Sequence, residues 1–307
     1  IKKAGRIAAE GLCDVCVEGN NAAIVEVNSE TDFVAKNDEF KSYVHAVAVQ
    51  ALNTSSDNME SFMAEAWNED NSMTVQEALT AKIAKIGENL TIRRFMKVTG
   101  DAVVSYVHGG GKIGVLVAAK NASDDASKEA LTNIAMQIAA MNPQYISRDN
   151  MSSEELANLK EVVIDSALNT PDTLPKPILT KLLTKASEGN MFSDEDAAAY
   201  EEQKNNLNYL FNFLSAEAKT TVAGLAMADK ENISSDKIFN GLVEGRVSKQ
   251  LKEICLLDQT YVKAEDGKQT VAQYLKSVNN DLAISRFVRF EVGEGIEKKQ
   301  ENFAEEV

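Results

Sequence analysis

The chain has 307 residues, 44% hydrophobic and 26% charged, a composition typical of a soluble globular protein with room for two domains. Its formal net charge of −15 excludes a general nucleic-acid binder, because such a protein presents a basic face to phosphates. No run of about 20 apolar residues is present, so we expect no membrane-spanning helix. Residues 1–9 predict the end of a helix and have no signal-peptide pattern, so we expect a cytoplasmic location.

The first predicted element is a β-hairpin over residues 12–28. Strand-like runs at 12–17 and 22–27 flank a turn that contains Gly19 and Asn20. Glycine and asparagine tolerate the positive φ angles of tight hairpin turns, so the two runs should pair as antiparallel strands.

Cys13 and Cys16 in the first strand form a C-x-x-C pattern, which can mark a redox or metal site. Alternation in a strand places the two thiols on opposite faces, with Cα atoms about 10 Å apart, beyond the reach of a disulfide. Cys255 is the one further cysteine, and three thiols without a nearby histidine are too few for a structural zinc site. We therefore interpret the cysteines as structural and reduced, and we expect no metal and no cofactor.

The segment after the hairpin joins a strand to a helix. Apolar residues recur there every three or four positions, which predicts a helix over residues 37–52. Ser29 and Asp32 are three residues apart, as in a capping box, and Thr31 is a second possible N-cap. On this pattern alone, Phe33 is predicted to be a core residue rather than a functional one, because phenylalanine is usually buried.

The next part of the chain predicts two more helices and a third strand. A short helix is expected around residues 62–67. Thr74 and Glu77 form a capping box at the start of a second helix, and Gly87 ends it, as glycine often does at a helix C-terminus. Residues 90–98 then have the pattern of a strand.

The same order of elements recurs later in the chain. Residues 89–95 line up with 281–287, which indicates two copies of one hairpin, helix and strand unit. We therefore predict an α+β fold, with two repeated three-stranded antiparallel sheet subdomains covered by helices. The second copy consists of a hairpin, a covering helix, a capped helix and a final strand, at residues 102–118, 128–141, from Thr270, and 283–292.

An insertion at residues 152–255 interrupts the second copy and is predicted to be helical. Its apolar spacing indicates a long helix at 156–168 and a returning helix at 243–254, which together would form a coiled-coil-like arm. Residues 178–227 are rich in leucine, phenylalanine and alanine and predict an added helical lobe. The predicted domains are the first core subdomain, the second core subdomain and the insertion, at residues 1–99, 100–151 with 256–295, and 152–255.

The run Gly-Gly-Gly-Lys at residues 109–112 superficially resembles a phosphate-binding loop. A Walker A loop requires Ser or Thr after the lysine and then a helix, whereas here Ile113 begins a strand, so we predict that this chain binds no nucleotide itself. The glycines instead predict a hairpin turn that would let the backbone of another protein approach closely. His45 and His108 have no acid or thiol partner at catalytic or metal spacing, so we interpret His45 as structural and expect no enzyme activity.

Four motifs occur in a fixed order along the chain. They are TDFVAKN, AKIGEN, HGGGKIGVLV and FVRFEVGEGIEK, at residues 31–37, 84–89, 108–117 and 287–298. Together they resemble the elongation factor Ts family, the guanine-nucleotide exchange factors of the translational GTPase elongation factor Tu. The resemblance covers residues 1–150 and 240–307, and most of the chain between them has no clear counterpart.

This resemblance implies a function in translation elongation without covalent chemistry. The family's paired core would be present, followed by a C-terminal helical module at residues 296–307. The helical module that precedes the core in the family is expected to be missing. The insertion resembles the helical hairpin through which some family members form homodimers, so a homodimer is a further expectation.

The resemblance also implies which residues contact elongation factor Tu. Phe33 would enter an apolar slot beside the switch region, and Asp32 would disturb the Mg²⁺ environment electrostatically without becoming a metal ligand. Lys263 stands where the family has an apolar residue, so the segment around it matches loosely. The implied contact residues are Asp32, Phe33, Ile86, Gly87, His108, Val262 and Lys263, and those involved in Mg²⁺ dislocation are Thr31, Asp32, Phe33 and Val34.

Two other functional classes remain open from the sequence. The chain could be a helical scaffold that uses a similar core for a different partner, with the insertion as its main support. It could also be a metal or redox protein using Cys13 and Cys16, which the predicted strand geometry disfavours. A GDP-release assay with elongation factor Tu distinguishes the first class from an exchange factor, and metal analysis tests the second.

Overall fold

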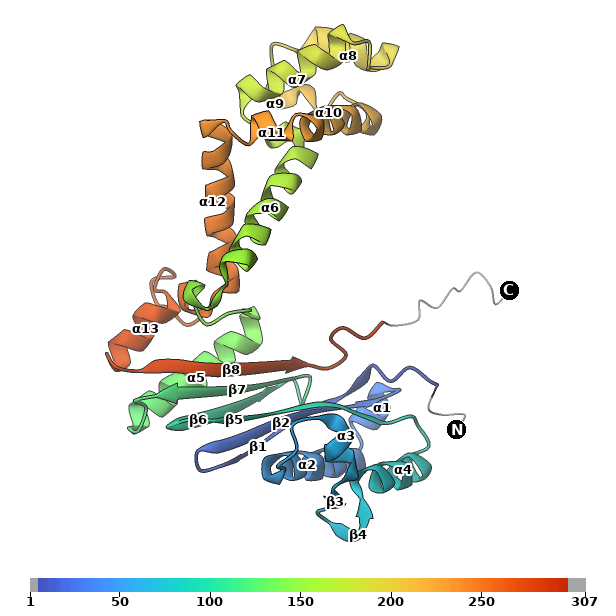
Figure 1. Cartoon of the computed structure of the whole chain (residues 1–307), viewed down its shortest axis with the longest axis vertical. Helices are drawn as coiled ribbons and strands as arrows, with labels where there is room; N and C mark the ends of the chain where they lie inside the picture. The colour runs from blue at the N-terminus through green and yellow to red at the C-terminus, as the bar shows by residue number, and fades with distance from the viewer. Residues whose placement is uncertain (1–4, 298–307) are drawn as a thin grey trace. The chain divides into compact units, whose positions relative to one another are not determined.

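The computed structural model describes residues 5–297 and divides the chain into two compact units (Figure 1). The first, which we call the core unit, contains Ile1–Ile146 and Cys255–Val307, and the second, the helical unit, contains Ser147–Ile254. The fold is α+β, as predicted. Each unit has its own hydrophobic core and is described separately below.

The first repeat of the core unit is a three-stranded antiparallel sheet with the order β1-β2-β5. Gly19 and Asn20 form the tight turn between β1 and β2, and Gly19 has the positive φ of 59° that such a turn requires. The strands are β1 (Glu10–Glu18), β2 (Asn21–Ser29) and β5 (Thr91–Thr99), and the helices are α1 (Asp32–Ala35), α2 (Asp38–Asn53), α3 (Met59–Ala64) and α4 (Val75–Ile86).

The second repeat has the same sheet order, β6-β7-β8, although the helical unit separates β7 from β8 in sequence. Asn142 ends its long helix in the left-handed conformation, with a φ of 48°. The strands are β6 (Ala102–His108), β7 (Ile113–Lys120) and β8 (Ala283–Glu291), and the helices are α5 (Asp125–Met141), the short 3-10 helix η3 (Leu256–Asp258) and α13 (Val271–Val278).

The two repeats also have the same irregularity, one extra residue in the third strand of each sheet. In the first sheet, Ile92 pairs with Val27 and Arg94 pairs with Glu26, which leaves Arg93 as an extra residue in a β-bulge. In the second sheet, the residue left over in β8 is Ser285. Arg93 and Ser285 are aligned in the sequence repeat, so the two copies share their pairing register as well as their order of strands.

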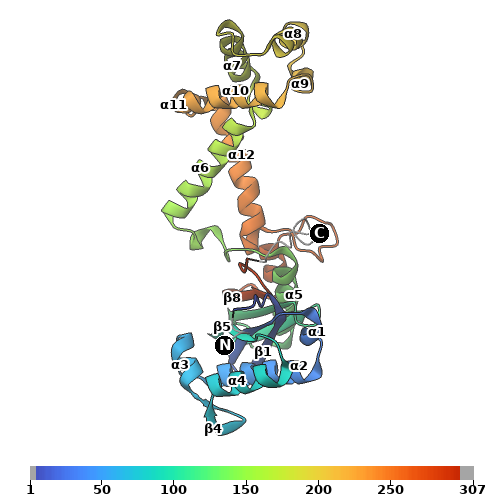
Figure 2. The ribbon, with the colours of Figure 1, turned by 90° about the vertical axis from the view of Figure 1, so that its right-hand side faces the viewer.

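The two sheets pack face to face, and helices cover their outer faces, so the core unit has four layers (Figure 2). Helices α2 and α4 cover the first sheet, and α5 and α13 cover the second. A Cβ atom at Gly114 in β7 would lie 3.0 Å from Ile24 and 3.2 Å from Cys13, so glycine lets the sheets approach closely there. The residues buried between the sheets are Cys13, Ala22, Ile24, Val98, Leu116, Ala118, Val288 and Phe290.

A buried carboxylate joins the two repeats beside this apolar contact. Glu26 is fully buried, and its oxygens accept hydrogen bonds from Arg94 Nε at 2.6 Å, Arg93 Nη1 at 3.1 Å and Asn28 Nδ2 at 2.9 Å. The bulge explains why two consecutive arginines reach one carboxylate, since regular alternation would direct them to opposite faces. Gly293, just after β8, also donates its N–H to Glu26 at 2.8 Å, so this side chain fixes the end of β8 against the first sheet.

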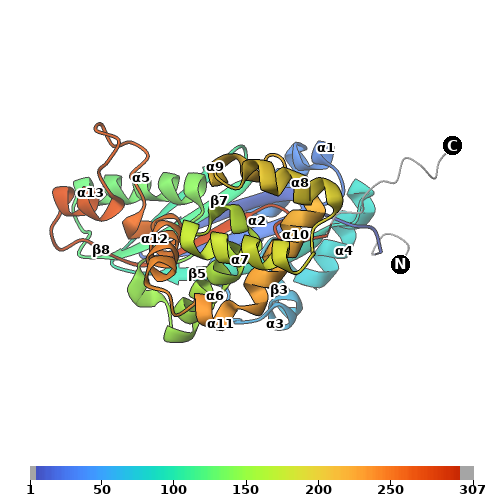
Figure 3. The same ribbon diagram turned by 90° about the horizontal axis from the view of Figure 1, so that it is seen from above.

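The helical unit has a core formed by its long helices and the shorter helices between them. Helix α6 contacts both α10 and α12, and α7 contacts α10. Figure 3 draws the helices of this unit from above. Burial along α6 is strongest in its second half, where Val163, Ile164, Ala167 and Leu168 face this core. The elements are η1 (Arg148–Asn150), α6 (Ser153–Asn169), η2 (Pro171–Thr173), α7 (Lys176–Glu188), α8 (Asp194–Gln203), α9 (Leu207–Leu210), α10 (Ala216–Ala228), α11 (Lys230–Ile233) and α12 (Lys237–Ile254).

Three local predictions are corrected by the structure. Residues 5–9 do not form the end of a helix, because Arg6 O accepts a 2.6 Å bond from Asn89 and the segment continues extended into β1. Ser29 is not an N-cap; its hydroxyl donates to Thr31 O, and Thr31 caps α1 instead. Trp67 does not belong to the short helix, since it lies in β3.

Trp67 forms part of a small two-stranded sheet that the sequence patterns missed. This sheet consists of β3 (Ala66–Trp67) and β4 (Asp70–Thr74). Gln50 of α2 donates to Ala66 O at 3.1 Å and accepts from Asn68 N at 2.9 Å, so one buried side chain holds the backbone of this hairpin. The predicted C-terminal helical module at residues 296–307 lies largely outside the described residues, which end at 297.

Candidate functional site

Among the core-unit residues that the structure describes, Phe33 is the most exposed large apolar side chain, with 79% of its surface accessible. It lies on α1, a single helical turn between β2 and α2. Ala35 on the same turn is buried, and Val34 packs against the core of the first repeat. The turn is therefore anchored by two of its residues while Phe33 and Asp32 face solvent, so the core role suggested by the local pattern is wrong for Phe33.

A carboxylate at the end of α4 fixes the start of this turn. Glu88 accepts hydrogen bonds from the backbone N–H groups of Glu30 and Thr31, both at 3.1 Å, and from the Thr31 hydroxyl at 2.8 Å. In return, Asn89 donates its N–H to Glu30 at 2.8 Å. These reciprocal bonds place α1 beside the end of α4, although the two segments are more than 50 residues apart in sequence.

Ile86 and Gly87 therefore lie close to the Asp32–Phe33 turn. Ile86 is partly buried against the first core, and Gly87 ends α4 in the left-handed conformation with a φ of 89°. Glycine is needed at this position because other residues rarely adopt that conformation. We call the residues Thr31–Val34 together with Ile86 and Gly87 the first contact group.

Helix α4, which ends at the first contact group, is also joined to α2 by ion pairs. Glu39 at the start of α2 accepts from Lys82 at 3.2 Å and pairs with Lys85 at 2.6 Å. The hydrogen bonds from Lys85 and Lys82 lower the pKa of Glu39 from its usual value. These pairs are solvent-exposed, so we regard them as orienting the helices rather than as a large source of stability.

The second repeat brings His108, Val262 and Lys263 together into a second contact group. His108 is exposed at the end of β6, and its Nδ1 lies 2.9 Å from the Tyr106 hydroxyl. Buried Gln137 of α5 holds the Val262 loop by accepting from Val262 N at 2.8 Å, and Lys263 donates to Asn133 at 2.8 Å. His108 and Val262 line one surface hollow of about 490 Å³.

The glycine turn after His108 packs against its own chain at one end and is open at the other. Gly109, Gly110 and Gly111 all have positive φ angles, as a hairpin turn of this kind requires. Gly111 approaches a backbone closely, but that backbone is strand β1 of the same chain, since Cys13 N donates to Gly111 O at 2.7 Å. A Cβ atom at Gly110 would meet nothing within 4 Å, so this part of the turn is open to solvent.

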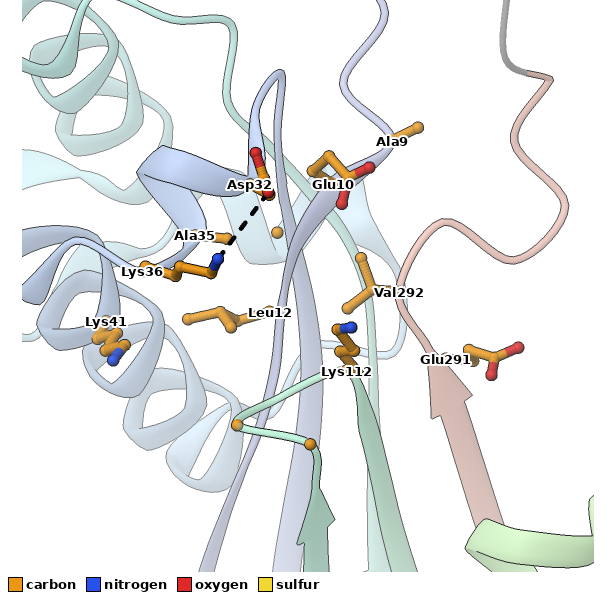
Figure 4. Close-up of a pocket in the computed structure, with 13 residues that line it drawn as sticks. Ala9, Glu10, Leu12, Asp32, Ala35, Lys36, Lys41, Lys112, Glu291 and Val292 are labelled. Carbon is orange, nitrogen blue, oxygen red and sulfur yellow. Dashed lines mark ion pairs between the residues drawn. The ribbon is translucent and has the colours of Figure 1, made fainter.

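A hollow of about 410 Å³ lies between the first contact group and the glycine turn (Figure 4). Asp32 of α1 and Lys36, the residue directly after α1, line one side, and their side chains form an ion pair at 4.0 Å. Lys112, Glu291 and Val292 line it from the second repeat. Glu291 also borders the hollow that contains His108, so the two hollows adjoin.

Comparison with known proteins matches this arrangement of motifs. The sequence pattern described as "Elongation factor TS" covers residues 30–294, which is most of the chain. The chain belongs to the elongation factor Ts family. Relatives named elongation factor Ts from Clostridioides difficile (strain 630), Clostridium botulinum (strain Eklund 17B / Type B) and Clostridium tetani (strain Massachusetts / E88) are 41%, 36% and 36% identical to it. Each alignment spans 100% of this chain and 82–83% of the relative.

Membership of the elongation factor Ts family decides the functional class. The chain is a nucleotide-exchange factor of translation elongation and not a catalytic enzyme. The alignments also correct one expectation, because they run through the helical unit, for which the sequence motifs gave no counterpart. The helical unit is therefore a feature that these elongation factor Ts relatives align with, and not an addition peculiar to this chain.

Some important residues carried no assigned role in the sequence motifs. Glu88 was visible in the AKIGEN motif, but its contact with Thr31 could not be read from spacing. Glu26 gave a clearer signal, as the one charged residue within the apolar run of β2, because a buried charge requires partners. Among residues 5–297, no helix is long and apolar enough to cross a membrane.

Proposed function

We propose that this chain promotes GDP release from elongation factor Tu by inserting Phe33 into an apolar slot beside the Mg²⁺ and switch region of the GTPase. The observation that supports this proposal most directly is the 79% exposure of Phe33 on an anchored turn. A phenylalanine ring buries a large area and has few rotamers, so it loses little conformational entropy on insertion. Val34, Thr31 and Glu88 hold the turn before binding, which lowers that cost further.

Asp32 acts beside the inserted ring by disturbing the Mg²⁺ environment of the partner. Its carboxylate is exposed next to Phe33, and its one ion pair, with Lys36, is long at 4.0 Å. It is thus available to interact electrostatically with a partner. Tight GDP binding depends on Mg²⁺ and on contacts to the phosphates. An exchange factor binds the state in which these contacts are broken, so bound nucleotide lowers the affinity of elongation factor Tu for the factor, and the bound factor lowers its affinity for nucleotide by the same ratio. Each tenfold loosening of GDP corresponds to about 1.4 kcal/mol of this coupling.

The second contact group serves to place the ring. Ile86 and Gly87 extend the first group, while His108, Val262 and Lys263 bind elsewhere on elongation factor Tu. Two separated groups on one rigid core define an orientation, which a single exposed ring does not. This division of labour predicts that binding survives the loss of Phe33 while exchange does not.

The test is release of a fluorescent GDP analogue from elongation factor Tu, followed by stopped flow with and without this chain. Catalytic amounts of this chain should accelerate release of the analogue. At saturating amounts of the chain, the concentration of the excess unlabelled GDP should not change the acceleration. Absence of acceleration by a folded protein would leave the proposal without support and favour a scaffold for a different partner.

We further propose that the helical unit mediates homodimer formation and that the protein acts in the cytoplasm, where translation elongation takes place. Val162 on α6 and Ile238 on α12 are 62% and 61% exposed, and we propose that a second copy of the chain covers them. Sedimentation equilibrium over a range of concentrations tests the dimer. Replacement of both residues by lysine should shift the equilibrium to monomer without changing helix content.

A further inference from the structure

Arg289 on β8 is a buried cation whose hydrogen bonds are incomplete. Its side chain is 8% exposed, and it faces α5, where Nη2 donates to Ala139 O at 3.1 Å. Nε and Nη1 are also buried and make no hydrogen bond to any part of the chain that the structure describes. Buried polar groups are nearly always paired, and a guanidinium has five donors to satisfy, so the missing acceptor calls for an explanation.

The Arg289 guanidinium, in which Nε and Nη1 make no hydrogen bond among the described residues, lines the hollow that also contains His108 and Val262. The other walls are mostly apolar, with Ile113 from β7 and Met136, Ala139 and Ala140 from α5. An unpaired donor and an apolar lining at the same place are the usual features of a binding pocket. The hollow therefore combines two residues of the second contact group with a donor that lacks a partner.

The charges near Arg289 indicate which acceptor fits. Glu291 Oε1 lies 3.6 Å from Nη2, and Glu294 Oε2 lies 3.8 Å from Nη1. Both distances are too long for hydrogen bonds, yet both carboxylates offset the charge of the guanidinium. A third carboxylate would be repelled by these two, whereas a neutral carbonyl oxygen would not. Such oxygens are unpaired at turns and at the C-terminal ends of helices.

We propose that this hollow is a binding subsite in which Arg289 donates to a main-chain carbonyl oxygen of elongation factor Tu while an apolar side chain of the same segment fills the space beside His108 and Val262. This inference rests on the proposed function, because it names the acceptor for the second contact group. Arg289 is a binding residue here, and it has no role in displacing Mg²⁺. The partner segment is a turn or helix end with an apolar residue.

The first experiment measures the affinity of Arg289→Met for nucleotide-free elongation factor Tu. Methionine keeps much of the apolar stem and removes every donor, so the dissociation constant should rise about 10- to 100-fold, as for loss of a hydrogen bond to a charged group. Arg289→Lys should recover part of the loss. The matched control is Arg286→Gln, an exposed arginine on the opposite face of the same strand, which should bind like the original protein.

A coupling measurement separates the subsite from a general effect on the fold. When Arg289→Met and His108→Ala are combined, the rise in the dissociation constant should be smaller than the product of the two separate rises, because both changes alter one hollow. When Arg289→Met and Phe33→Ala are combined, their separate effects on the dissociation constant should multiply, since Phe33 belongs to the first contact group. A thermal melt of each variant identifies any loss that comes from unfolding.

A spectroscopic measurement decides the matter if Arg289→Met proves unstable. In the original protein labelled with ¹⁵N-arginine, the Arg289 Nε–H resonance should shift and its hydrogen exchange should slow when elongation factor Tu is added. An unchanged resonance in the saturated complex, or normal affinity of a folded Arg289→Met protein, would overturn the subsite while leaving the exchange activity intact. Failure of the original protein to bind or to release GDP would instead overturn the proposed function together with this inference.

Discussion

The two repeats of the core unit have the same order of strands in their sheets but differ in the connections between their elements. In the first repeat, the hairpin turn is tight, and the connection from β2 to the covering helix contains α1 with exposed Phe33. In the second, β7 leads to α5 through residues 121–124, while the hairpin turn is the longer glycine run after His108. The buried strands allow little change, whereas the connections are free to differ, and they carry most residues of the two contact groups proposed above.

This comparison separates a frame, the paired sheets with Glu26, from the contact groups attached to it. A change in the frame should alter stability and then function, whereas a change in a connection should alter function alone. Four predictions test this separation, from the largest expected effect to the smallest.

The largest effect is expected from Glu26→Ala, which breaks the frame. It leaves Arg93 and Arg94 without their shared buried carboxylate, and removal of one partner of a buried ion pair costs about 3–5 kcal/mol. Urea unfolding of the variant measures this loss. Glu18→Ala is the control, since Glu18 is exposed on β1 of the same hairpin. A loss below about 1 kcal/mol would show that the Glu26 cluster does not hold the repeats together.

Phe33→Ala tests the connection of the first repeat. Stability should change by less than about 1 kcal/mol because the ring is exposed, while catalysed GDP release should fall about 30-fold or more, as for an interface hot spot. Asp32→Ala should weaken release less, since it removes an electrostatic effect only. Phe213→Ala, an exposed phenylalanine of the helical unit, is the matched control. A variant that melts far earlier yet exchanges normally would return Phe33 to a structural role.

The sequence could predict the frame because its signals are local. The apolar runs of β1 and β2, the Thr74–Glu77 capping box and Gly87 each act within a few residues, and the structure has these features where the sequence places them. The contacts that set the site are different. Glu88 reaches Thr31 and Arg289 reaches Ala139 only after the chain has folded, so no spacing rule could reveal them.

The exposure of Phe33 shows the same limit in another way. A phenylalanine between a strand and a helix is usually buried, and only the family motif suggested otherwise. The structure explains the exception, because Ala35 and Val34 already fill the inward side of the short turn. The homologous motif and the folded geometry thus gave information that composition and periodicity lack.

Excision of the helical unit tests whether the second repeat needs its insertion for exchange. Leu256 N donates to Tyr145 O at 2.8 Å and Leu257 N donates to Ile146 O at 3.0 Å, so the two ends of the excised segment are already joined on the core unit. Replacing residues 147–254 with a Gly/Ser linker of about six residues should change GDP release by less than about twofold.

The excised protein should also be monomeric if the helical unit forms the dimer, and sedimentation measures this in the same sample. A large loss of exchange with an unchanged core melting transition would place the helical unit in the functional surface. The helical unit would then have to be counted with the connections that carry function.

The smallest effect is expected from the cysteines, which belong to the frame. In the part of the chain that the structure describes, Cys13, Cys16 and Cys255 form no disulfide, and burial raises the pKa of Cys13 to about 12. At pH 8 only about one Cys13 thiol in ten thousand is then a thiolate, the reactive form. Iodoacetamide should therefore leave native Cys13 unmodified, as mass spectrometry of the digested protein can show, and should modify it after unfolding. Rapid labelling in the folded state, or loss of exchange in a folded Cys13→Val, Cys16→Val protein, would restore a redox interpretation.

The position of β8 as the last strand of the core unit has a consequence for how the protein is made. A ribosome synthesises the first repeat as one continuous run through β5, so that sheet can close early. Strand β7 emerges next, but its partner follows only after the whole helical unit, and the pairing of Ile113 with Glu291 must wait for it. Until then β7 presents an open edge, the kind of surface on which nascent chains aggregate. We therefore expect that the helical unit folds on the growing chain before the second sheet is complete.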